Sequence, residues 1–265
     1  MKKRELDILN IVTKQGSVEV SKLAEMLEVS SVTVRKTLDS LESRKLIRRE
    51  HGFALAISKD DINNRLAVNY EIKQRIGREA AKTVSNGETV MIESGSCCAV
   101  LAERLVNEKQ NVTIITNSAF IADFIREKPS AKVILLGGEY QNEAQVMVGA
   151  LVRKCVESFC VDKFFIGTDG FSANTGFTGK NLDRAEAVQN MAKQANRVII
   201  LTDSEKFRQQ GVVMLLPTKA IDTVITDEGI DRQTESLLHE NEVQIVKVKG
   251  TPNDLASGDA GAEKE

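Results

Sequence analysis

Two adjacent cysteines, Cys97 and Cys98, follow a carboxylate and a Ser-Gly-Ser run in the stretch MIESGSCCAV, residues 91–100. Such residues suit either a reactive or metal-binding thiolate or a loop that holds an anion. The 265 residues contain only two histidines and two further cysteines, Cys155 and Cys160, with no zinc-type spacing. A metal site is therefore disfavoured, and these two further cysteines are expected to be small buried apolar residues. A redox role for the adjacent pair stays an alternative to anion binding.

The sequence around this stretch favours anion binding. A β-type run, residues 89–92, precedes it, and a helical segment, residues 99–106, follows it. Small residues between a strand and a helix leave backbone N–H groups free to face a ligand, and the amino end of a helix attracts negative charge. We therefore expect a phosphate-binding loop formed by Glu93, Ser94, Gly95, Ser96 and Cys97.

The same strand-then-polar pattern recurs along the chain. Runs rich in Val and Ile stop at small polar residues, with helical segments between most of them; the runs span 89–92, 112–115, 132–136, 163–166, 197–201 and 223–225. This alternation predicts a mostly parallel sheet covered by helices on both faces. Ligands of such sheets bind in a crevice beyond the carboxyl ends of the strands.

Side chains suited to a sugar phosphate gather at these strand ends. Lysines would pair with the phosphate, and amide and carboxylate groups would bind hydroxyls. A strand-end Asp or Asn can equally be a turn or helix cap, so the expectation rests on the recurrence. The further candidates are Asn117, Gly137, Gly138, Asp169, Lys180, Asp203 and Lys206.

The amino-terminal residues carry a local excess of positive charge, although the whole chain has a net charge of −2. Residues 1–57 hold eleven Lys and Arg against eight Asp and Glu. Ser30 is a good N-cap for a helix that follows it. The apolar spacing predicts three helices and then a β-hairpin, or wing: residues 4–14, 20–27 and 31–43, followed by 46–49 and 53–57.

Three short helices and a basic hairpin indicate a winged helix-turn-helix, in which the recognition helix enters the DNA major groove. A three-helix adaptor with a solvated charged face is the alternative. The candidate DNA contacts lie on the third helix and the wing: Ser31, Thr33, Arg35, Lys36, Arg44, Lys45, Arg48, Arg49 and His51.

Two sets of motifs resemble one known family. The stretch VEVSKLAEMLEVSSVTVRKTLDSLESRKLIRREHGFA is similar to the DNA-binding domain of the DeoR family of bacterial transcriptional regulators. The stretches IESGSCCAVLAERL, TIITNS, ILLGGEY, FIGTDGFSANTGFTGK and LTDSEKF resemble, in the same order, its sensor domain, which has a ribose-5-phosphate-isomerase-like fold. The resemblance covers residues 3–249, nearly the whole chain.

Four positions depart from the family pattern. Thr37 replaces an Asp in the recognition helix, where it would alter how that helix is anchored, and Phe53 replaces the second glycine of the wing. Glu93 replaces an Asp and Cys97 replaces a Thr in the phosphate loop. Because one loop hydroxyl is lost, we expect phosphate binding to depend more on backbone N–H groups.

The resemblance implies a repressor of a sugar or polyol operon that a phosphorylated sugar or polyol releases from operator DNA. It further implies a homo-oligomer, a dimer or tetramer, without cofactor, metal or catalytic residues. The enzymatic alternative is a sugar-phosphate isomerase with an accessory domain, in which Asp169 or Glu186 would be the base. Turnover of ribose 5-phosphate would distinguish the two.

The expected fold is α/β, with two domains. A winged helix-turn-helix domain over residues 1–57 is followed by a linker over 58–70 and a larger, mostly parallel α/β sensor domain over 71–249. Residues 250–265 lack apolar periodicity, and we expect a disordered tail. No apolar run approaches the roughly 20 residues of a membrane helix, so we expect a cytoplasmic protein without a membrane partner.

Overall fold

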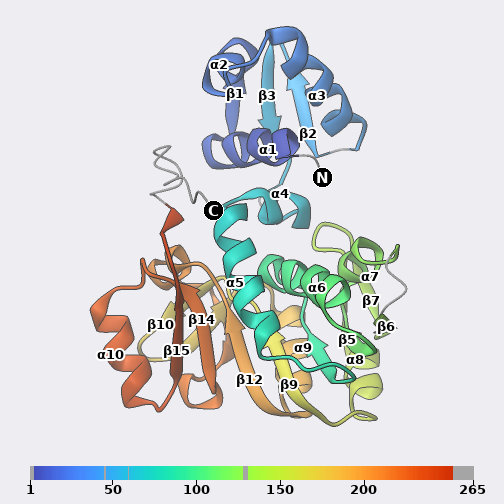
Figure 1. Ribbon diagram of the computed structural model, residues 1–265, viewed down its shortest axis with the longest axis vertical. Helices are drawn as coiled ribbons and strands as arrows, with labels where there is room; N and C mark the ends of the chain where they lie inside the picture. Colours follow the sequence, from blue (N-terminus) through green and yellow to red (C-terminus); the bar gives the residue numbers. More distant parts are fainter. Residues whose placement is uncertain (1–2, 45, 59, 128–130, 253–265) are drawn as a thin grey trace. The chain divides into compact units, whose positions relative to one another are not determined.

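The computed structural model describes residues 3–44, 46–58, 60–127 and 131–252 of the chain. The chain divides into two compact units, residues 1–70 and 71–265. Figure 1 shows the elements of each unit. In the described residues, no helix combines the length and the apolar character needed to cross a membrane.

The first unit is a winged helix-turn-helix, as the sequence predicts. A three-stranded antiparallel sheet has the order β1-β3-β2, of which the sequence foresees only the hairpin. The missed strand has only three residues, too few for a periodic signal. The elements are α1 (Lys3–Gln15), β1 (Ser17–Glu19), α2 (Val20–Met26), α3 (Ser31–Ser43), β2 (Ile47–Glu50), β3 (Phe53–Ala56) and α4 (Ile62–Ala67).

Helix α3 has the bounds that the sequence predicts. The side chain of Ser30 caps it by accepting the N–H of Thr33 at 3.2 Å. Val34, Leu38 and Leu41 recur at helical spacing and are fully buried in the core of the unit. Each buried side chain of this kind contributes about 1.5–3 kcal/mol to folding, which fixes the face that α3 turns outward.

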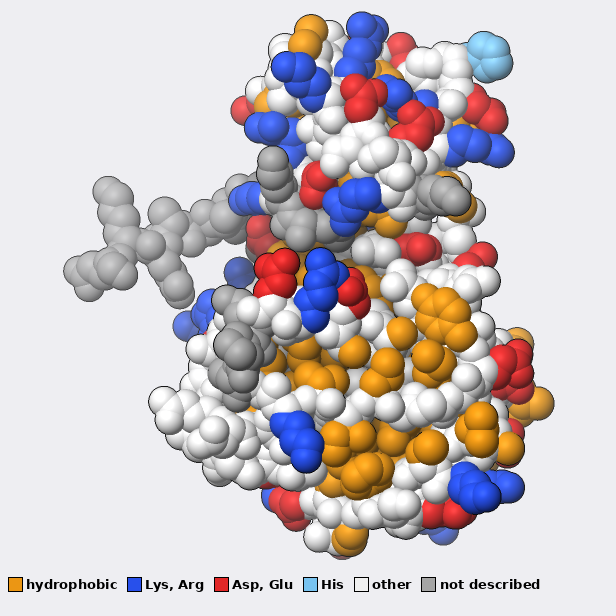
Figure 2. Space-filling view, turned by 90° about the vertical axis from the view of Figure 1, so that its right-hand side faces the viewer, with side chains coloured by type: hydrophobic (Ala, Val, Ile, Leu, Met, Phe, Trp, Pro, Cys, Tyr) orange, Lys and Arg blue, Asp and Glu red, His pale blue; other side chains and the backbone are white. Residues whose placement is uncertain are grey.

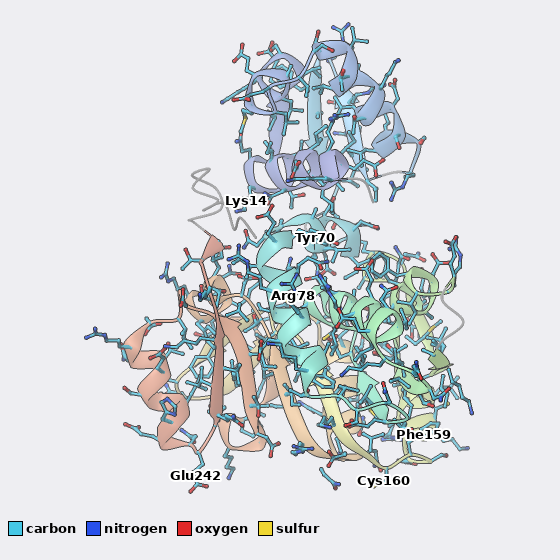
Figure 3. The ribbon with its side chains drawn as sticks, viewed as in Figure 1. Lys14, Tyr70, Arg78, Phe159, Cys160 and Glu242 are labelled. Carbon is cyan, nitrogen blue, oxygen red and sulfur yellow. The ribbon has the colours of Figure 1, made fainter. Side chains whose placement is uncertain are left out.

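The segment expected as a linker, residues 58–70, contains helix α4 and the start of α5 in its described part, residues 60–70. Asp61 caps α4 by accepting the N–H groups of its first turn. Ala67 and Tyr70 pack against the core of the first unit, and Lys14 donates to Asn69 at 2.9 Å (Figure 3 labels Lys14 and Tyr70). One and a half turns of helix carry too little periodicity to be seen in the sequence.

The second unit contains a seven-stranded parallel sheet in the order β15-β14-β12-β9-β4-β5-β6. Figure 1 shows α5 and α6 in front of this sheet. The strands of the sheet are β4 (Thr89–Ile92), β5 (Val112–Thr116), β6 (Ala131–Leu135), β9 (Val161–Ile166), β12 (Ala195–Leu201), β14 (Thr223–Asp227) and β15 (Gln244–Val248). The prediction of a parallel α/β sheet is confirmed, although β15 was not foreseen.

The remaining elements surround this sheet. Two small antiparallel sheets, β7-β8 and β10-β11-β13, were not predicted, and neither were α8 and α10. The helices of the unit and the strands of the two small sheets have these bounds: α5 (Tyr70–Lys82), α6 (Ser96–Glu108), α7 (Ala119–Phe124), β7 (Glu139–Gln141), β8 (Val146–Val148), α8 (Ala150–Val156), β10 (Gly170–Ser172), β11 (Gly176–Gly179), α9 (Leu182–Ala192), η1 (Ser204–Arg208), β13 (Val213–Leu216), η2 (Thr218–Ala220) and α10 (Arg232–Glu240).

The strand order reverses between β4 and β9. From β4 the chain runs outward through β5 to β6, and from β9 it runs the other way through β12 and β14 to β15. Such a switch point is where ligands bind in open α/β sheets, outside the carboxyl ends of the strands. The tail expected to be disordered lies almost wholly outside the described residues, which end at 252.

Candidate functional site

The recognition helix α3 presents exposed side chains in its first two turns. Ser31, Arg35 and Lys36 are exposed, and neither basic residue forms an ion pair with another described residue. Thr33 is half-buried. Its N–H donates to the hydroxyl oxygen of Ser30, and the two hydroxyl groups are hydrogen-bonded to each other. The two cations are therefore free to contact DNA.

Three arginine candidates of this unit, Arg44, Arg48 and Arg49, are held in ion pairs. Arg44 lies 3.3 Å from Glu5, and Arg48 lies 3.1 Å from Glu50. Phosphate contact would require each arginine to leave its carboxylate. Lys45, also a candidate, lies outside the described residues.

Arg49 braces the wing against the recognition helix. Its guanidinium on β2 lies 2.7 Å from Asp39 and 2.8 Å from Glu42, both on α3, and its backbone N–H donates to Glu42 at 3.0 Å. The hydrogen bond from Arg49 lowers the pKa of Glu42. Since two carboxylates already neutralise Arg49, its observed contacts are structural.

We expect Arg49→Ala to loosen the wing, whereas Arg48→Ala should not. The first change removes two ion pairs and a guanidinium shared between strand and helix, whereas the second removes one exposed pair, which contributes little. Hydrogen exchange of residues 46–56, followed by mass spectrometry without DNA, should be faster in Arg49→Ala only. Equal exchange in the two variants would contradict the bracing role.

The wing ends in a two-residue turn. His51 and Gly52 have φ angles of 48° and 86°, the left-handed conformation that tight hairpins require. His51 is exposed, as a DNA contact must be, and Phe53 beside it is 42% exposed. Val32, which was not among the expected contacts, is 59% exposed at the start of α3. Its position next to Ser31, at the start of the predicted recognition helix, could have identified it from the sequence.

The loops after β4 and β9 touch each other at the switch point. A Cβ atom on Gly95 would lie 3.1 Å from the Cα of Gly167. No larger residue fits at position 95 without a shift, which explains the glycine. The phosphate loop expected from the sequence therefore lies at the place where the topology predicts a ligand.

The carboxylate of Glu93 lies inside this loop. Glu93 is 8% exposed, and its two oxygens accept the hydroxyl of Ser94 at 2.6 Å and the N–H of Gly167 at 3.3 Å. Gly95 is the N-cap of α6, and Ser96 begins the helix half-buried. The Glu93 carboxylate thus occupies two hydrogen-bond donors, the Ser94 hydroxyl and the Gly167 N–H, that a bound oxyanion would need.

The adjacent cysteines are packed in the core. Cys97 is 5% exposed and Cys98 is fully buried, and neither forms a disulfide with another described cysteine. The thiol of Cys98 donates to the carbonyl of Phe165 at 3.6 Å. Cys155 is half-buried, but Cys160, expected to be buried, is exposed directly before the amino end of β9 (Figure 3). Its position in a loop before the strand explains the difference.

Two candidate residues hold buried oxygens that accept no hydrogen bond from a described residue. They are Asn117 Oδ1, after β5, and Asp203 Oδ1, after β12. The side chains are 1% and 3% exposed, and the amide of Asn117 is oriented by donating to the carbonyl of Met147 at 3.0 Å. A buried acceptor without a donor is costly, and a ligand hydroxyl would supply the donor.

Asp227, at the end of β14, contacts the segment after β12 and was not among the residues expected from the sequence. It is fully buried and accepts the N–H groups of Ser204 at 2.7 Å and Gly229 at 3.0 Å. Burial raises the pKa of Asp227, the hydrogen bonds from Ser204 and Gly229 oppose this, and nearby Asp203 raises the pKa further. Its position in a Thr-Asp pair directly after the run 223–225 could have identified it from the sequence.

Lys206 is the candidate cation nearest in sequence to these carboxylates. It lies on η1, is half-buried and forms no ion pair with another described residue. Lys180 is exposed, and its backbone N–H donates to Asp169 at 3.2 Å. Asp169 directly precedes β10 and Lys180 directly follows β11, so that bond joins the two strands at the open end of the hairpin.

The two glycines after β6 have different surroundings. A Cβ atom on Gly138 would lie 2.6 Å from the carbonyl of Val148, so packing alone requires this glycine. Gly137 is exposed, with open space around it. The surroundings of the two glycines therefore do not indicate a ligand. Across the described ranges, no group of three or more His, Cys, Asp or Glu could hold a metal ion.

Family models match both units of the chain. The DeoR-like helix-turn-helix domain matches residues 4–60, and the DeoR C terminal sensor domain matches residues 68–228. A transcriptional regulator of the helix-turn-helix type from Staphylococcus epidermidis is 32% identical over 75% of this chain and 82% of its own. The glycerol-3-phosphate regulon repressor of Escherichia coli is 26% identical over 91% of this chain and 97% of its own.

A solved structure of ribose 5-phosphate isomerase from Methanocaldococcus jannaschii aligns with 52% of this chain and 55% of its own. The identity is 19% and the TM-score 0.39, values that support no functional conclusion. The relatives above are named as regulators, which disfavours the isomerase alternative. Two matched domains in the family's order show that the chain belongs to the DeoR family of DNA-binding transcriptional regulators.

Proposed function

We propose that this regulator represses a sugar or polyol operon and is released from its operator by a phosphorylated sugar or polyol. The observation that carries this is a pair of buried acceptors, Asn117 Oδ1 and Asp203 Oδ1, at two strand ends of one sheet, for which the described residues supply no donor. Hydroxyl groups are donors of the right kind. The relative named as a glycerol-3-phosphate regulon repressor supports the phosphorylated polyol class.

In this proposal the phosphate binds the loop from Glu93 to Cys97, which begins a helix of 13 residues. Backbone N–H groups at the start of α6 and its dipole favour the anion. Lys206 on η1 supplies the opposite charge.

On DNA, Arg35 and Lys36 of α3 reach base edges or phosphates in the major groove, and His51 on the wing lies beside the backbone. Two copies of the chain occupy the two halves of a pseudo-palindromic operator. Ligand and DNA prefer different states of the protein, so by linkage each weakens the binding of the other equally.

Thermal-shift measurements with sugar and polyol phosphates, beside their unphosphorylated forms, test the sensor. Operator DNA is obtained by selection from random sequence with the purified protein, and any stabilising compound is then added in a gel shift. The proposal expects phosphorylated compounds alone to stabilise the protein and to release DNA. Stabilisation by the unphosphorylated forms, or no enriched DNA sequence, would contradict it.

Glu93→Gln should bind phosphate about tenfold more tightly than the native chain. Two unit charges about 4 Å apart repel by several kcal/mol at an effective dielectric constant near 20, and part of that cost is relieved when the glutamate carboxylate loses its charge. Glutamine keeps an oxygen that accepts the N–H of Gly167. Inorganic phosphate titrated into each protein in a thermal-shift assay measures the difference.

Glu139→Gln, an exposed position on β7, controls for the change in net charge and should behave like the native chain. Weaker phosphate binding by Glu93→Gln would show that the carboxylate assists the ligand, for example by orienting the hydroxyl of Ser94, and does not compete with it.

A further inference from the structure

The second unit exposes large hydrophobic side chains on a limited part of its surface. They come from β6, β7, α8, the start of α9 and the segment at β13, and none of the described ones comes from α5, α6 or α10. Figure 2 shows hydrophobic side chains gathered on the face of this unit. We name as the apolar band the residues Leu135, Tyr140, Leu151, Leu182, Val212 and Met214.

Contacts inside the unit join the elements that carry the apolar band. The side chain of Gln141 on β7 donates to Asn181 at the start of α9 at 3.4 Å. The side chain of Gln189 on α9 donates to the carbonyl of Met214 on β13 at 3.0 Å. Helix α8 packs against both α9 and β8. These contacts place β7, α8 and β13 around α9, and α7 connects β6 to β8 beside them.

Basic groups gather at one end of this face. A groove of about 480 Å³ lies between α8 and the end of α9, and its lining includes Arg153, Lys154 and Lys193 against one carboxylate, Glu157. None of these four side chains forms an ion pair with another described residue, and Leu151 of the apolar band lines the same groove. This end has unpaired positive charge and a cavity.

Two carboxylates lie at the other end. Asp183 and Glu186 are exposed in the first half of α9 and form no ion pair within the described residues, and the exposed Lys180 directly before the helix offsets one of them. Asp183 and Lys193, the C-cap of α9, are ten residues apart, or about 15 Å at 1.5 Å per residue. The face thus has an excess of positive charge at one end and a smaller excess of negative charge at the other, with hydrophobic side chains beside both.

We propose that a second copy of this chain covers this face, with the two α9 helices antiparallel. A two-fold axis places the acidic end of each copy on the basic end of the other, so one surface is complementary to itself. Large exposed apolar patches mark interaction sites, and charges at the rim fix the register. The proposal deepens the proposed function, which needs two copies on one operator.

Paired charge reversals test this arrangement in the full chain, without DNA or effector. Asp183→Lys with Glu186→Lys makes both ends basic, and Arg153→Glu with Lys154→Glu makes both ends acidic. In sedimentation equilibrium each double variant should associate with itself at least tenfold more weakly than the native chain. An equimolar mixture of the two should recover native association, because the acidic copy now fits the basic one.

Arg232→Glu and Glu240→Lys on α10 are the matched controls, since both residues are exposed away from this face. They should associate like the native chain. Leu182→Asp tests the apolar band at a side chain 68% exposed, where no core contact is lost, and should also weaken association. Native association in either double variant, a mixture that stays dissociated, or a native chain that is monomeric would overturn the proposal.

The gel shift separates this inference from the repressor proposal. If the mixture recovers association but no protein binds selected DNA, the interface stands and the DNA proposal falls. If DNA is bound and association ignores the charge reversals, the regulator stands and the interface lies elsewhere.

Discussion

Arg35→Ala should weaken operator binding by about 30-fold to 10⁴-fold at constant salt. An arginine that reads a base contributes about 1–3 kcal/mol, and two half-sites double that loss. Arg35 is exposed near the start of α3 and forms no ion pair with another described residue, so the folded unit should lose less than about 0.5 kcal/mol of stability. Fluorescence anisotropy with labelled operator measures the effect.

Arg232→Ala, on α10 of the second unit, is the control with the same change of charge. It should bind operator like the native chain, and Arg35→Ala should still bind effector like the native chain. If Arg35→Ala kept native operator affinity at matched salt, α3 would not be the element that reads DNA. A loss confined to low salt would make Arg35 a phosphate contact.

Lys206→Ala should raise the effector concentration that releases half of the DNA by about tenfold to 100-fold. A hydrogen bond to a charged group contributes about 1.5–3 kcal/mol, and Lys206 forms no ion pair that its loss would leave unpaired within the described residues. Operator affinity without effector should not change, because the residue lies in the sensor unit. Gel shifts over a series of concentrations of a hit from the thermal-shift screen measure the midpoint.

Lys180→Ala is the informative comparison for that midpoint. Its side chain is exposed, and its backbone N–H, which the substitution keeps, makes the bond to Asp169. We expect a smaller shift than for Lys206→Ala. Equal midpoints in Lys206→Ala and the native chain would remove Lys206 from the phosphate site, and a larger shift in Lys180→Ala would assign the role to that residue.

Local sequence signals were enough to predict much of the fold. Helix α3 is determined by a short stretch of sequence, which contains its N-cap Ser30 and the helical spacing of Val34, Leu38 and Leu41. The structure has the predicted bounds. Buried strands flanked by polar turns are equally local. Strand β15 and the small antiparallel sheets depend on partners far along the chain, which no single stretch reveals.

The candidate site was predictable in place but not in detail. Strand-to-helix spacing located the loop at Gly95, yet only the structure shows Glu93 turned into it. The contact follows from β4 and β9 being neighbours. In the same way Asp227 is buried because β12 and β14 pair, and Arg49 meets Asp39 and Glu42 only when the wing folds against α3.

The brace at Arg49 has a consequence for how salt acts on this regulator. Salt weakens exposed ion pairs, and it also reduces the counterion release that drives DNA binding. Both effects act in the same direction, since a loosened wing binds DNA less well. The slope of log affinity against log salt would then exceed the value set by phosphate contacts, and Arg49→Ala would show the smaller slope that counts those contacts alone.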